Sequence, residues 1–90
     1  QDRERVVVTA EELQVDDHSG STVVCRSFSR RGLRVAIDEV TGLIVIQSQG
    51  QESRIGRFLT RPQRQQFLKD LRRALADPGG PFFNQSGLGI

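Results

Sequence analysis

Hydrophobic and polar residues alternate along most of the first 58 residues of the chain. A period of two is typical of a β-strand that buries one face, because successive side chains point to opposite sides of a sheet. A run of apolar residues at 43–46, LIVI, instead predicts a central strand covered on both faces. The pattern predicts about six short antiparallel strands, at residues 5–9, 13–15, 22–28, 33–37, 43–46 and 52–58.

Polar and glycine-rich clusters separate these strands. Residues 16–20, DDHSG, predict the hairpin turn between the second and third strands, and residues 38–42, DEVTG, predict another. The segment SRRG at 29–32 interrupts the alternation, and QGQ at 49–51 turns the chain into the last strand. Within that strand, Gly56 permits a bulge or a close approach of another backbone.

The hydrophobic period changes to about 3.6 residues after Thr60, which predicts an amphipathic helix over 61–76. Thr60 is a suitable N-cap and Pro62 fits the first turn, while the segment PGGP at 78–81 ends the helix. One apolar stripe must lie against the sheet, and it comprises Phe67, Leu68, Leu71, Ala74 and Leu75.

These elements predict an α+β fold, an antiparallel sheet of about six short strands followed by one C-terminal amphipathic helix. A bent sheet capped at one end by a helix is also the arrangement of a pleckstrin-homology-like fold, an analogy that concerns the fold alone. We expect a single domain over 1–76 and a Gly/Pro-rich tail over 77–90, from which Phe82 and Phe83 dock back onto the domain.

Charge is distributed in blocks that the formal net charge of +2 conceals. Residues 1–20 contain six acidic residues and two arginines, whereas residues 26–34 contain four arginines and no acid. Residues 54–73 contain seven basic residues and one acid, and 12 of the 13 basic residues of the whole chain are arginine. Arginine forms bidentate contacts with phosphate or carboxylate better than lysine does.

The basic blocks supply the candidate binding residues. One interpretation is a solvated surface without a ligand, and the other is a single membrane-facing surface made by the first block and the helix arginines. At the strand–helix corner, Arg57 and Arg64 are candidates to clamp the turn, a carboxylate or a ligand; if they bind a ligand, replacing both by Gln should leave stability nearly unchanged. The candidates are Arg26, Arg30, Arg31, Arg34, Arg57, Arg64, Arg72 and Arg73.

Residues suited to catalysis are scarce in this chain. The single His18 lies in a predicted turn, and the single Cys25 is expected to be a small buried hydrophobic residue in a strand. Asp16, Asp17 and His18 are typical turn residues, so we expect no metal site there. With no convergent acid, base and nucleophile and no phosphate-binding glycine loop, the sequence predicts neither an enzyme nor a cofactor.

Nucleic-acid binding and a membrane span within the chain are both disfavoured. A sequence pI near 9.5 is compatible with nucleic acid, but the chain has five Phe, no Tyr and no Trp, and none is interleaved with basic residues on a strand. No apolar run approaches the length of about 18 residues that a membrane-spanning helix requires. One cysteine also excludes an internal disulfide.

Residues 3–15 and residues 33–75 form two stretches that together resemble a bacterial integral-membrane family, the domain of unknown function 2244 family. Residues 3–15, RERVVVTAEELQV, are similar to the segment that follows its second transmembrane helix. Residues 33–75 resemble its C-terminal soluble region, most specifically in GRFL at 56–59 and LRRAL at 71–75. Members often carry an aromatic residue just before Leu33, where this chain has RRG instead.

The resemblance implies two transmembrane helices ahead of residue 1, so the chain is a soluble piece of a longer protein or a reduced relative. We expect a non-enzymatic domain beside the membrane, on the cytoplasmic face, that binds a protein partner or docks to anionic lipid. The alternative is a module that self-associates or adds a partner strand at a sheet edge.

Overall fold

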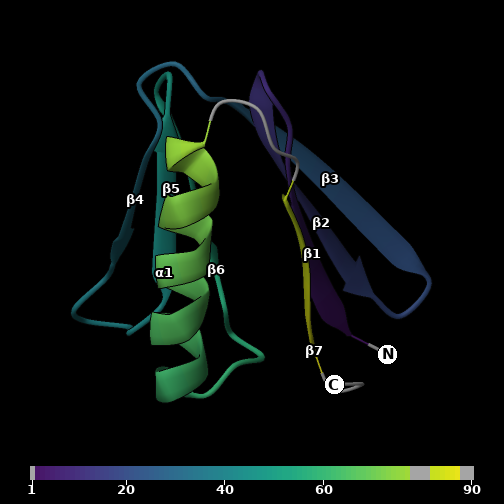
Figure 1. Ribbon diagram of the computed structural model, residues 1–90. Coiled ribbons are helices and arrows are strands. Elements are labelled where there is room, and N and C mark those ends of the chain that lie inside the picture. The colour runs from purple at the N-terminus through teal and green to yellow at the C-terminus, as the bar shows by residue number, and fades with distance from the viewer. Residues whose placement is uncertain (1, 78–81, 88–90) are drawn as a thin grey trace.

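The computed structural model describes residues 2–77 in full and the backbone of residues 82–87. Two antiparallel sheets and one helix make up the fold, and Figure 1 shows the helix lying along one sheet while the other sheet is splayed away from it. The elements are β1 (Arg3–Val8), β2 (Glu12–Ser19), β3 (Thr22–Ser29), β4 (Arg34–Ile37), β5 (Ile44–Ser48), β6 (Gln51–Ile55), α1 (Arg61–Ala76) and β7 (Phe82–Gly87).

The first sheet has the strand order β3-β2-β1-β7. Its registers place Leu13 opposite both Val8 and Phe28, and all three side chains are buried. At the far end of the same face, Glu4 lies opposite Asp17, so apolar rows give way to charged ones along the sheet. The predicted α+β class is confirmed, but the strands divide between two sheets. Residues 30–33 form the loop that connects β3 of the first sheet to β4 of the second.

The second sheet has the order β4-β5-β6, with β5 at its centre. Ile44 and Ile46 of β5 and Ile55 of β6 are buried on the inner face. Val45 lies between them on the outer face and is half-buried, with the exposed Ala36 and Arg54 as its cross-strand neighbours. The prediction that this strand is covered on both faces is therefore wrong, because no described element packs on the outer side of the sheet.

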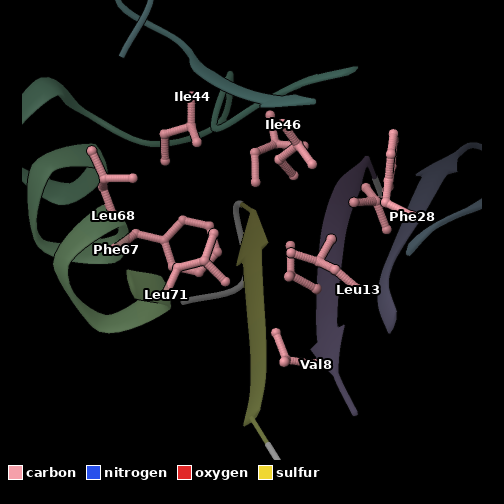
Figure 2. Packing of buried hydrophobic residues seen from close by; sticks show 11 residues of the cluster. Val8, Leu13, Phe28, Ile44, Ile46, Phe67, Leu68 and Leu71 are labelled. Atoms are coloured by element: carbon pink, nitrogen blue, oxygen red, sulfur yellow. The ribbon is translucent and has the colours of Figure 1, made fainter. Parts of the chain in front are cut away.

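Helix α1 begins and ends where the sequence predicts. The Thr60 hydroxyl accepts a hydrogen bond from the Gln63 backbone N–H, and the Gln63 side chain accepts one from the Thr60 N–H, which forms a capping box. Figure 2 shows Phe67, Leu68 and Leu71 turned into the space between the sheets. No helix in the described part of the chain is long and apolar enough to cross a membrane.

The predicted turn at residues 16–20 is wrong in its position. Residues 16–19 continue β2, and the chain reverses at Gly20, whose φ of +60° suits a glycine. Polar residues fit this end of the strand because Asp16, Asp17 and His18 are only half-buried there. Cys25 is exposed on β3, so the prediction that it is buried is also wrong.

A further strand lies within the segment that the sequence predicts to be a tail. The backbone of β7 pairs antiparallel with β1, from Val8 opposite Phe82 to Arg3 opposite Gly87. The docking predicted for the side chains of Phe82 and Phe83 falls outside the described residues. The domain boundary after residue 76 stays a prediction.

Candidate functional site

Arg30 joins the two halves of the fold at one end of the molecule. Its guanidinium donates through Nη1 to the Thr9 carbonyl and through Nη2 to the Leu75 carbonyl, both at 2.7 Å. Thr9 directly follows β1 and Leu75 lies in the last turn of α1, where carbonyls lack helical partners. The arginine thus fixes the 30–33 loop beside the C-terminal end of the helix.

The same end of the molecule carries the exposed arginines of both basic blocks. Arg72 of α1 donates to the Val35 carbonyl of β4 at 3.0 Å, which ties the last turns of the helix to the strand that starts at Arg34. Arg31, Arg34 and Arg73 are exposed, and within the described residues their guanidinium groups make no hydrogen bond or ion pair. We call Arg31, Arg34, Arg72 and Arg73 the basic end.

Two shallow hollows flank the 30–33 loop at this end. One, of about 570 Å³, is lined by Arg31, Gln49, Ser29 and Glu11. The other, of about 340 Å³, is lined by Arg34, two glycines and the polar residues of the β5–β6 hairpin. Both linings combine a guanidinium with amide and hydroxyl groups, and all three groups can donate hydrogen bonds to anionic oxygens.

One acidic residue in each hollow opposes the positive charge of the arginine that lines it. Glu52 lines the smaller hollow, but it already accepts hydrogen bonds from Gln47 and Arg54. These contacts, with that to Gln47 the largest, lower the pKa of Glu52 from its ordinary value, so the carboxylate stays ionised. Glu11 in the other hollow is exposed. The basic end therefore keeps an excess of positive charge.

At the opposite end of the four-stranded sheet, a buried carboxylate joins the two sheets. Glu4 is 1% exposed, and its Oε1 accepts a hydrogen bond from the Gly56 N–H at 2.8 Å. Burial raises the pKa of the Glu4 carboxyl, although the Gly56 N–H and the Arg57 charge act in the opposite direction. Asp17, opposite Glu4, pairs with Arg57 at 2.8 Å and with Arg26 at 3.9 Å.

Arg64 packs across the strand–helix corner. Its Nη1 donates to the Leu59 carbonyl at 2.6 Å and to the Gly56 carbonyl at 3.3 Å. A Cβ added at Gly56 would lie 3.0 Å from Cδ of Arg64, so the group that comes close to this glycine is the Arg64 side chain and not another backbone. Arg57 lies over the Phe58 ring, 4.8 Å from its centroid. Arg57 thus holds the Asp17 carboxylate and Arg64 holds the turn. That either arginine binds a ligand stays a prediction.

The structure therefore separates the eight candidate arginines into two groups. Arg30, Arg31, Arg34, Arg72 and Arg73 come together at the basic end, whereas Arg26, Arg57 and Arg64 lie toward the Glu4 end. The sequence assigns Glu4 no role and predicts Asp17 only as a turn residue, so neither is expected as an acidic partner of these arginines. Glu4 stands two residues before Val6 and four before Val8, so all three side chains lie on the same face of the strand. This spacing was the signal that could have placed Glu4 on the buried face.

Residues with metal-binding or nucleophilic side chains do not converge. Among residues 2–77, no three His, Cys, Asp or Glu side chains gather as a metal site would require. The exposed Cys25 thiol donates a hydrogen bond to the Asp16 carboxylate, and this hydrogen bond is the main cause that raises the pKa of Cys25. A raised thiol pKa makes a poor nucleophile near neutral pH.

Comparison with known protein families gives a match over most of the chain. A family model described as integral membrane protein (DUF2244) matches residues 1–75. This range includes strands β1 to β6 and nearly all of α1, and it ends before β7. No significant match was found among curated proteins. No solved structure matches either.

Proposed function

Because this chain belongs to the DUF2244 family of integral membrane proteins, whose function is unknown, we propose that it forms a non-enzymatic domain beside a membrane and docks electrostatically to anionic lipid. The docking surface is the basic end. Clustered arginines beside a membrane are attracted to the negative surface potential of the cytoplasmic leaflet, so the proposed location is the cytoplasmic face.

The bridge made by Arg30 carries this proposal. Arg31 and Arg34 precede Arg72 and Arg73 by about forty residues in the sequence. Arg30 brings the two pairs to one end of the molecule, because it donates hydrogen bonds to the Thr9 and Leu75 carbonyls. The exposed Arg31 and Arg34 thereby lie at the same end as Arg72 and Arg73. Side chains without acidic partners gain most from phosphate, because no existing ion pair has to be broken.

Vesicle co-sedimentation tests the proposal. We expect the chain to bind vesicles that contain phosphatidylglycerol, to bind pure phosphatidylcholine vesicles weakly, and to be released by salt. Each arginine near an anionic surface contributes about 1 kcal/mol, so Arg31→Gln with Arg34→Gln should weaken binding roughly 30-fold.

A matched double variant controls for total charge. Arg3→Gln with Arg61→Gln removes two exposed arginines from the starts of β1 and α1, at the other end of both elements from the Arg30 bridge. This variant should keep most of the binding. Equal binding to neutral and anionic vesicles, or equal losses in the two double variants, would contradict docking through the basic end and favour a protein partner.

A further inference from the structure

Strand β3 forms an open edge of the four-stranded sheet. Among the described strands it lies at the end of the strand order and pairs only with β2, through an unbroken register from Thr22 opposite Ser19 to Ser29 opposite Glu12. Figure 1 places β3 at the outer margin of the molecule. The backbone N–H and C=O groups of alternate residues therefore point away from the sheet along its other side, where they could form hydrogen bonds with a further strand.

This edge carries fewer of the features that protect edges elsewhere in the described fold. A side chain caps it at its last residue, where the Ser29 carbonyl accepts a hydrogen bond from the Ser48 hydroxyl at 2.6 Å. Strand β4 is short, and the carbonyl of its residue Val35 accepts a hydrogen bond from Arg72. Strand β6 presents Glu52 and Arg54, which pair with each other. By contrast, β3 has eight residues, no proline and no bulge, and its one charged residue, Arg26, lies against Asp17.

Exposed apolar side chains lie along the same edge. Val23 is 51% exposed and Val24 is 50% exposed, on opposite faces of the strand. The third large exposed apolar side chain of the described residues, Val40, lies apart in the turn before β5. Pairing at the edge would remove apolar surface of both valines from water, which favours association.

We propose that β3 pairs antiparallel with β3 of a second copy of this chain, which joins two four-stranded sheets into one continuous sheet. A two-fold axis places residues of the same face opposite each other, so even-numbered residues meet even-numbered ones. Two such registers overlap most. One centres on Cys25 and pairs Val24 with Arg26 of the second copy, and the other centres on Arg26 and pairs it with itself.

Charge selects between these registers. Two arginines directly opposite each other repel, which disfavours the register centred on Arg26. In the register centred on Cys25, Arg26 of the second copy lies beside Val24, whose other neighbour is Asp17. Each guanidinium then lies between its own Asp17 and, one strand further, Asp17 of the second copy. The β3 edges of two copies of the chain are therefore complementary in charge.

Sedimentation velocity across a range of concentrations tests this pairing. We expect the 10.1 kDa chain to shift from monomer toward twice that mass as its concentration rises. Val24→Lys places a charge opposite Arg26 of the second copy, and it should abolish the shift. Val40→Lys adds the same charge at a residue that is 93% exposed and far from β3, and it should leave the shift unchanged.

A thiol crosslinker of short span tests the register. Cys25 lies on the two-fold axis, so a bis-maleimide should link wild-type chains in pairs, most efficiently at mildly alkaline pH because the Cys25 pKa is raised. In a Cys25→Ser background, Ser27→Cys faces Val23 of the second copy and should crosslink poorly. A single monomer mass at every concentration, or a shift that survives Val24→Lys, would overturn the proposal. Crosslinking at residue 27 but not at residue 25 would overturn the register.

Discussion

The Glu4 carboxylate and the Gly56 N–H, 52 residues apart in the sequence, form a buried hydrogen bond of 2.8 Å. The contact joins the first strand of one sheet to the corner that follows the last strand of the other. Glu4 is 1% exposed, so both the hydrogen bond and the charge are held away from bulk water. A carboxylate in that position couples the packing of the two sheets to pH.

Replacing Glu4 tests that coupling. Glu4→Ala leaves the Gly56 N–H without its acceptor and should lower the free energy of unfolding by about 1–3 kcal/mol, whereas Glu4→Gln retains an acceptor oxygen and should cost less. Urea unfolding followed by circular dichroism measures both. Equal losses for the two variants would show that the hydrogen bond contributes little.

The pH dependence of stability follows from the raised pKa of Glu4. Between the ordinary value of 4.5 and the raised value, the folded chain holds more protons than the unfolded chain. The contribution of Glu4 is therefore fully present below the ordinary pKa and is lost as pH rises through the raised pKa. Urea titrations over this range should show a falling contribution in wild type that is absent in Glu4→Gln. A contribution that rises with pH would contradict the assignment.

Arg30 should be the arginine whose loss most affects the basic end structurally. Arg30→Lys cannot reach the Thr9 and Leu75 carbonyls with a planar fork, so we expect a loss of about 1.5–3 kcal/mol in the free energy of unfolding. Arg31→Gln is the neighbouring control, because its exposed guanidinium makes no hydrogen bond or ion pair with the described residues. Equal stability of the two variants would show that the bridge is not formed in solution.

Gly56 is required at the corner by both its backbone and its neighbour. Its φ is +96°, and an added Cβ would lie 3.0 Å from Cδ of Arg64. Gly56→Ala should therefore destabilise the fold by about 1–3 kcal/mol. Gly20→Ala, at φ +60° with open space around it, isolates the cost of the backbone and should be the milder change. Thermal unfolding compares the two variants directly.

The two arginines of the corner should differ when they are replaced singly. Arg64→Gln removes a donor to the Leu59 and Gly56 carbonyls and should lower stability by about 1–3 kcal/mol. Arg57→Gln breaks a half-exposed ion pair with Asp17 and should change stability by less than about 1 kcal/mol. Denaturant midpoints of the single variants therefore separate a structural arginine from one that is free to bind a partner.

The elements whose signals are local could be predicted from the amino-acid sequence. The 3.6-residue period, the Thr60 cap and Pro62 define α1 within a few neighbouring residues, and its bounds are as predicted. The reversal at 38–42 is also where the sequence places it, because Asp38 accepts hydrogen bonds from the backbone N–H groups of Val40 and Thr41. These features depend on residues that are adjacent in the chain, so a pattern in the chain reveals them.

Contacts between residues that are distant in the sequence could be seen only in the folded chain. Residues 16–19 look like a turn locally, but pairing with β1 and β3 extends them into a strand. Strand β7 depends on an edge that β1 offers from the other end of the chain. The bridge of Arg30 and the burial of Glu4 arise the same way, since hydrogen bonds across 45 and 52 residues leave no periodic trace in the sequence. Local propensity acts between neighbours, whereas sheet pairing and burial are fixed by the whole fold.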